Sequence, residues 1–162
     1  MSTTGGFTSS GLLQEELLLT LPVLDVADAL EIGEIAKSFG TQRGLPIAVE
    51  VRVGDWAVYH ASLPGSTPEN DWWIGRKARV VKLKQHSTMF ERVLAEEQGI
   101  DWHKENNLLD ETHAIHGGGL PLITKDDGLV GVLLISGLPQ VDDHLLGVEV
   151  LTEFLARKGE LL

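Results

Sequence analysis

The spacing of apolar residues predicts helices alternating with pairs of strands along this chain. From Asp25 to Phe39 the apolar residues share one broad helical face, with Asp25 placed to cap the helix and Gly40 to end it. The other predicted elements are a hairpin of strands 46–53 and 56–61, a helix from Thr67 and Pro68 to about His86, a helix capped by Thr88 and Glu91 and ended by Gly99, a hairpin of strands 119–124 and 129–136, and a helix over 141–157.

This order of elements predicts an α+β fold. Hairpins, in place of alternating strand and helix units, imply a central antiparallel sheet of about four to five strands with helices packed against it. Residues 1–11 are rich in Ser, Thr and Gly and are expected to form a disordered tail. One domain is expected over 12–162, and residues 101–111 are expected to form a polar connection without regular structure.

Composition narrows the classes of function. The chain has 162 residues and no cysteine, so disulfides and thiolate ligands are excluded, and His and carboxylate remain as the strong metal ligands. The formal charge of −11 argues against partners such as nucleic acid and anionic membranes. The apolar run Leu17–Leu21 is too short to span a membrane. We therefore expect a soluble cytoplasmic protein.

The segment from His113 to Pro121, which reads His-Ala-Ile-His-Gly-Gly-Gly-Leu-Pro, is the most informative motif. Consecutive glycines at 117–119 indicate left-handed dihedrals or close approach by a ligand, a neighbouring subunit or another strand of this chain. In an extended segment His113 and His116 point to opposite faces, so a shared metal is not predicted. Either imidazole, His116 above all, is a candidate axial haem ligand; the alternative is that both bond backbone groups near the turn.

A second group of candidates follows two tryptophans. Arg76 comes one helical turn after Trp72, and Lys77 one turn after Trp73, so this face suits a carboxylate or phosphate, including haem propionates. The alternative is a solvated face paired with acidic neighbours. Ser136 and Gly137 end a buried-looking strand. The candidate ligand-binding residues are therefore His116, Gly117, Gly118, Gly119, Trp73, Arg76, Lys77, Ser136 and Gly137.

No catalytic residue is predicted. The His-Gly-Gly-Gly run is similar to the oxyanion loop of lipase-like hydrolases, but the chain contains no Gly-x-Ser-x-Gly nucleophile elbow. Asp142 and Asp143 begin the last predicted helix, where carboxylates suit the helix dipole. The functional alternative is a pocket in which this helix start and the glycine loop meet beside Arg76. Asp143 and His144 are not predicted to act as an acid–base pair, because sequence neighbours do not face each other on a helix.

Taken together, Trp72-Trp73, Arg76-Lys77, His86-Ser87, His113 to Pro121 and Ser136-Gly-Leu-Pro139 with Asp143-His144 resemble the UPF0303 branch of the DUF336 family, also called haem-degrading or GlcG/HbpS-like. The resemblance covers about Leu24 to Phe154. It implies a profilin-like fold and homo-oligomers, from dimers to rings or larger shells. Some relatives bind haem or cobalamin-pathway compounds, so haem is the cofactor that the resemblance implies, and it supplies no catalytic residue.

Three hypotheses of function follow. The first is a small-molecule binding or sensory module, non-catalytic or only weakly catalytic. In it the glycine loop (117–119), the helix with Trp72, Trp73 and Arg76, and the turn of residues 136–139 build pockets in a homo-oligomer. The second is a haem-binding or haem-degrading protein. The third is an oligomeric scaffold for protein partners. Haem titration with His116→Ala as control separates the first two hypotheses, and the third is favoured if no small ligand shifts the melting temperature.

Overall fold

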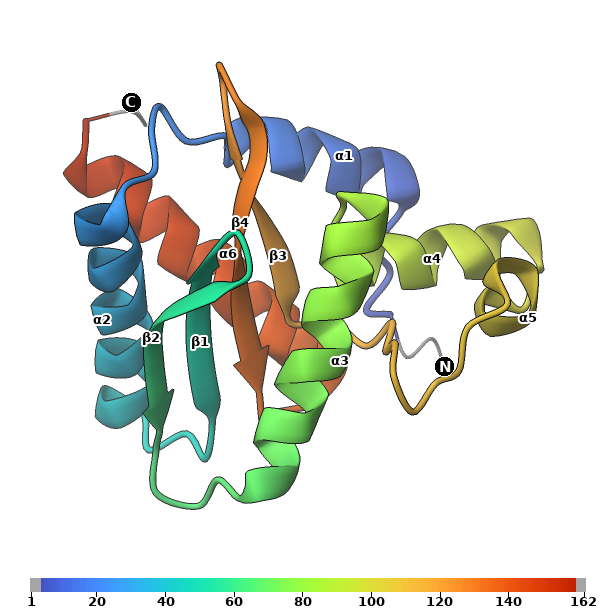
Figure 1. Ribbon diagram of the computed structural model, residues 1–162, viewed down its shortest axis with the longest axis horizontal. Coiled ribbons are helices and arrows are strands. Elements are labelled where there is room, and N and C mark those ends of the chain that lie inside the picture. The colour runs from blue at the N-terminus through green and yellow to red at the C-terminus, as the bar shows by residue number, and fades with distance from the viewer. Residues whose placement is uncertain (1–3, 160–162) are drawn as a thin grey trace.

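Four strands form one antiparallel sheet in the order β2-β1-β4-β3 in the computed structural model, which describes residues 4–159 (Figure 1). The strands are β1 (Ala48–Val53), β2 (Trp56–Ser62), β3 (Gly119–Thr124) and β4 (Gly128–Ser136). Both predicted hairpins are confirmed, β1 with β2 and β3 with β4. The long connection from β2 to β3 places β4 beside β1, so the two hairpins join at the centre of the sheet.

Helices cover both faces of this sheet, which confirms the α+β class (Figure 1). The helices are α1 (Ser9–Leu18), α2 (Val26–Gln42), α3 (Pro68–Lys84), α4 (Thr88–Gln98), α5 (Trp102–Asn106) and α6 (Gln140–Arg157). Alternate strand residues separate the two layers: Val49 and Ile135 face α2 and α6, whereas Leu134 packs with α3. No helix within residues 4–159 is long and apolar enough to cross a membrane.

Two predicted helix boundaries are wrong. Gly40 does not end α2, which continues to Gln42. A Cβ on Gly40 would lie 2.5 Å from Leu63 Cδ1, so the glycine permits close packing instead. Thr88 does not cap α4, because Ser87 is the cap and its side chain accepts from Phe90 N at 3.0 Å.

The structure differs from the sequence expectation at the N-terminus. Helix α1 begins at Ser9, three residues before the expected start of the ordered domain, and residues 1–3 of the expected tail lie outside the described range. Glu15 Oε1 lies 2.6 Å from His144 Nε2, and Glu16 Oε2 lies 2.8 Å from His86 Nδ1. These two contacts hold α1 on elements that are distant in sequence, so no local pattern predicts them.

The expected polar connection 101–111 contains a helix, α5, and the prediction of no regular structure there was wrong. Asp101 caps α5 by accepting from the backbone N of His103 and of Lys104. Trp102 is buried, and its Nε1 donates to Glu91 Oε1 at 2.9 Å. Burial of one large side chain therefore stabilises a helix too short to show periodicity.

Candidate functional site

Two glycines of the triplet approach a lysine of the same chain. Gly118 has a φ of 125°, and a Cβ there would lie 2.3 Å from Ile135 O and 2.7 Å from Lys77 Nζ. Gly119 approaches the same side chain, since its Cβ would lie 3.4 Å from Lys77 Cβ. Among the three partners that the motif left open, the structure therefore identifies this chain itself, through α3 and the end of β4.

Lys77 forms a buried ion pair with Asp143, from the first turn of α6. Their side chains are 2% and 3% exposed. Lys77 Nζ donates to Ile135 O at 2.9 Å and to Asp143 Oδ2 at 3.3 Å. Asp143 Oδ1 accepts from Leu138 N at 3.0 Å. The sequence interpretation of Asp143 as a capping acid was therefore incomplete. His144 does not face Asp143, as expected for sequence neighbours, and it pairs instead with Glu15.

Burial shifts the acidity of both members of this pair towards the neutral form. It raises the pKa of Asp143 to about 6, against the opposing effect of the Lys77 charge. It also lowers the pKa of Lys77, and here the Asp143 charge opposes the shift. Because the pKa of Asp143 is higher in the folded protein than in the unfolded chain, its protonated form favours folding, and this stabilisation is lost as pH rises through about 6.

A pocket of about 280 Å³ opens above the ion pair. Its lining includes six of the nine candidate ligand-binding residues, contributed by α3, the glycine loop and the end of β4: Trp73, Lys77, His116, Gly117, Ser136 and Gly137. The candidate list did not include the other five lining residues, Glu69, Asn70, Leu138, Gln140 and Asp143. Asn70 Nδ2 donates to Ser136 Oγ at 3.3 Å, and Gln140 Oε1 accepts from Gly117 N at 3.2 Å. No spacing in the sequence marks these cross-element contacts.

His116 lies at the pocket wall as a neutral imidazole. Burial, followed by the charges of Arg92 and Lys77, lowers the pKa of His116 to about 4. Its Nε2 lies 3.3 Å from Arg92 Nη2, so the guanidinium donates and the imidazole accepts. The ring packs edge to face on Trp73 with 4.7 Å between centroids.

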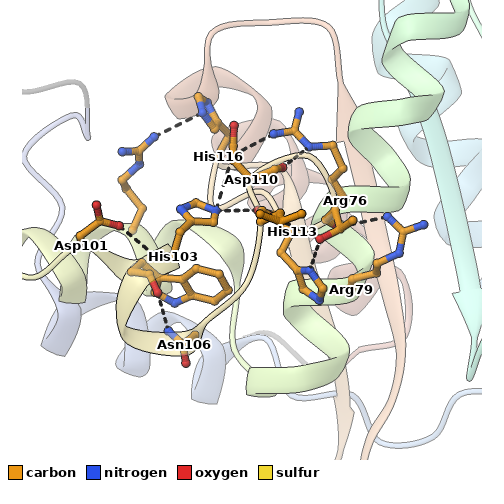
Figure 2. Close-up of polar contacts among 12 residues, drawn as sticks. Arg76, Arg79, Asp101, His103, Asn106, Asp110, His113 and His116 are labelled. Atoms are coloured by element: carbon orange, nitrogen blue, oxygen red, sulfur yellow. Dashed lines mark hydrogen bonds and ion pairs between the residues drawn. The ribbon is translucent and has the colours of Figure 1, made fainter.

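Arg76 is directed away from the pocket. Its guanidinium carbon lies 4.1 Å from the ring centroid of Trp72 and 4.2 Å from that of Trp73. Its Nη2 pairs with Asp110 Oδ1 at 2.8 Å, and its Nε donates to Asp110 O at 2.7 Å (Figure 2). The alternative of a solvated face paired with acidic neighbours is therefore right about the pairing and wrong about the solvent, because the Arg76 side chain is only 1% exposed.

His113 lies outside the pocket, in a cluster that attaches the loop after α5 to α3 (Figure 2). Its Nδ1 lies 2.8 Å from Thr112 Oγ1, and its carbonyl lies 2.7 Å from His103 Nε2. Arg79 Nη1 donates to Thr112 O at 3.0 Å. No three His, Asp or Glu side chains among residues 4–159 are grouped closely enough to hold a metal ion.

Comparison with known proteins identifies the family. A model of the family described as haem degrading protein HbpS-like matches residues 24–152. A UPF0303 protein of Streptomyces avermitilis is 39% identical over 143 residues, which is 88% of either chain. The UPF0303 protein RL3365 of Rhizobium johnstonii is 34% identical over 153 residues, which is 94% of either chain.

Solved structures agree in fold. The crystal structure of the Ybr137w protein matches with a TM-score of 0.84 and 22% identity, covering 91% of this chain and 89% of that one. A crystal structure described as a PduOC:heme complex matches with a TM-score of 0.64 and 17% identity, covering 79% of this chain and 94% of that one. With the family match and the UPF0303 relatives, we conclude that this chain belongs to the UPF0303 branch of the HbpS-like, or DUF336, family.

Proposed function

We propose that this protein is a small-molecule binding or sensory module that works as a homo-oligomer and does not turn over its ligand. One observation carries the proposal: three chain segments meet in a pocket whose floor is the buried Lys77–Asp143 pair. Burying two charges is costly, and replacing such a pair with apolar residues is often neutral or stabilising. A buried pair with shifted acidity, facing a pocket, is therefore a candidate functional site.

The lining favours a small polar ligand. The volume of about 280 Å³ lies just below the range for drug-sized molecules. Lys77 supplies one positive charge, but Asp143 and Glu69 also line the pocket and His116 is neutral at physiological pH. An anionic ligand would therefore meet at least as much negative as positive charge.

A variant in which a larger side chain fills the pocket tests this proposal. In Ser136→Leu the larger side chain would fill part of the pocket. Ser38→Leu makes the same change at an exposed position of α2 and serves as the control. In a screen of small polar metabolites by thermal shift, we expect a compound that raises the melting temperature of the wild type and of Ser38→Leu but not of Ser136→Leu. If no compound shifts the melting temperature, the protein-scaffold hypothesis takes its place; a compound that stabilises Ser136→Leu equally would place binding elsewhere.

Exposed apolar side chains support the oligomer. Leu17 and Leu18 on α1 are 75% and 70% exposed, and Trp56 at the start of edge strand β2 is 63% exposed. Leu17 and Leu18 are adjacent on α1, and exposed apolar surface of this kind is found at protein interfaces. Light scattering coupled to size exclusion on the screening samples is expected to give a mass above that of the 17.6 kDa chain.

Haem binding is the second candidate, favoured by the family description and by the haem complex of one structural neighbour. A neutral His116 has the protonation state of a haem ligand. However, its Nε2 accepts from Arg92, Arg76 is already paired with Asp110, and the pocket is small and polar. The described pocket therefore does not fit a haem, with its apolar plane and two propionates.

Haemin titration tests this second candidate. We expect a broad Soret absorbance that does not saturate and is the same in the wild type and in His116→Ala, because the titrated haemin finds no built site. A sharp, saturable band near one haem per subunit that His116→Ala abolishes would establish haem binding and identify its ligand.

A further inference from the structure

Lys77 has the surroundings of a reactive amine. Its Nζ is held in one position by Ile135 O and Asp143 Oδ2, and Gly118 gives it space that no other residue would leave. Although the side chain is 2% exposed, it lines the pocket floor together with Asp143. Lys77 is therefore almost wholly buried and borders the pocket.

A lysine in such a place has two properties that an exposed lysine lacks. Burial lowers the pKa of Lys77, so the neutral, nucleophilic amine is more populated near pH 7 than in an ordinary lysine. Asp143, with a pKa raised to about 6, is a carboxyl that both accepts and donates a proton near neutral pH. Amine and carboxyl lie 3.3 Å apart, within the reach of one proton transfer.

We propose that the pocket takes small neutral aldehydes or ketones and captures them as a reversible imine on Lys77. This inference rests on the binding function proposed above and names the class of its ligand. The Nζ lone pair attacks the carbonyl carbon, and a C–N bond forms while Asp143 takes a proton from nitrogen. Asp143 returns this proton to the oxygen, which gives the neutral carbinolamine. Asp143 then carries the second nitrogen proton to the hydroxyl group, the C–O bond breaks with loss of water, and the C=N bond of the imine forms. Hydrolysis reverses each step and releases the ligand unchanged.

The rest of the lining suits this class of ligand. Glu69 and Asp143 disfavour a carboxylate or phosphate on the ligand, and the volume of about 280 Å³ limits its size. Trp73 provides an aromatic wall, while Asn70 and Ser136 provide polar groups beside it. A compact carbonyl compound without charge therefore matches the pocket better than an anion does.

Reductive trapping on the wild-type protein tests the inference. The probe is butanal with cyanoborohydride at pH 7, which reduces an imine to a stable secondary amine, and the modified lysines are located by peptide mass mapping. Lys82, 68% exposed on the same helix, is the internal control. We expect Lys77 to be modified at least about tenfold more than Lys82, because an ordinary lysine is almost wholly protonated at this pH.

Asp143→Asn gives a readout that a purely structural lysine would not show. The Asp143 charge raises the pKa of Lys77 against the effect of burial, so its removal lowers that pKa further. The pH of half-maximal trapping at Lys77 is expected to move down in this variant, while that at Lys82 stays the same.

Melting-temperature shifts with butanal and with 1-butanol, measured without reductant, separate this inference from the proposed function. Trapping at Lys77, with stabilisation by butanal and not by 1-butanol, supports both the imine and the proposed binding function. Equal stabilisation by both compounds with no label on Lys77 overturns the imine and leaves the binding module. Labelling confined to exposed lysines with no shift from either compound overturns capture of small carbonyls, and the metabolite screen with Ser136→Leu then decides the binding function separately.

Discussion

Replacing Gly118 with alanine is expected to lower the free energy of unfolding by about 3–5 kcal/mol. Two costs act together at this position. A φ of 125° is a conformation that residues with a Cβ rarely adopt, and the added Cβ would lie 2.3 Å from the backbone oxygen of Ile135. Backbone at the end of a central strand has little freedom to move, so the overlap displaces the loop from the ion pair. Urea unfolding followed by tryptophan fluorescence measures the change.

Gly44→Ala is the matched control. Gly44 also has a positive φ, 62°, but nothing lies within 4 Å of a Cβ built there. In this variant only the left-handed backbone conformation is unfavourable, so the free energy of unfolding is expected to fall by about 1–2 kcal/mol. Equal losses in the two variants would show that the glycine loop is not packed around Lys77 as described.

Replacing Lys77 with methionine is expected to lower the free energy of unfolding by about 3–5 kcal/mol at pH 8. Methionine retains most of the volume, but it leaves the Asp143 carboxylate buried without its cation. Below pH 6 the loss should shrink, because a carboxyl whose pKa is already raised to about 6 becomes protonated and no longer carries a charge. Denaturant unfolding at several pH values measures both effects.

The double variant Lys77→Met with Asp143→Leu distinguishes a lost ion pair from lost packing. With both charges absent, most of the stability is expected to return, since apolar replacement of a buried pair is often neutral or better. The double-mutant cycle then gives a coupling energy between the two positions. Additive losses would show that the two side chains do not act as a pair. If the double variant regains its stability but does not bind the ligand, the ion pair serves binding and not stability.

Secondary structure followed from local sequence wherever an element carries its own pattern. The Asp25 cap predicted the start of α2, and the Gly54-Asp55 turn predicted the hairpin of β1 and β2, because both signals act between residues close in sequence. Helices α1 and α5 have N-terminal caps, Thr8 and Asp101, but no apolar periodicity by which the sequence predicts them. Glu15 holds α1 by its contact with His144, which is distant in sequence, and Trp102 holds α5 by its hydrogen bond to Glu91 on α4.

The candidate site, too, was predictable from the sequence only in part. The sequence by itself determined that glycines 117–119 meet something closely, since three consecutive glycines imply a backbone that other residues cannot adopt. It also placed Trp73, Lys77 and Ser136 among the binding candidates, and these line one pocket. Only the tertiary structure decided that the glycines pack against other segments of this chain, Lys77 among them. It also decided that Arg76 pairs with Asp110 and that Lys77 and Asp143 form a buried ion pair. Lys77 and Asp143 are 66 residues apart, and burial, which sets their acidity, exists only after α3 and α6 have packed against the sheet.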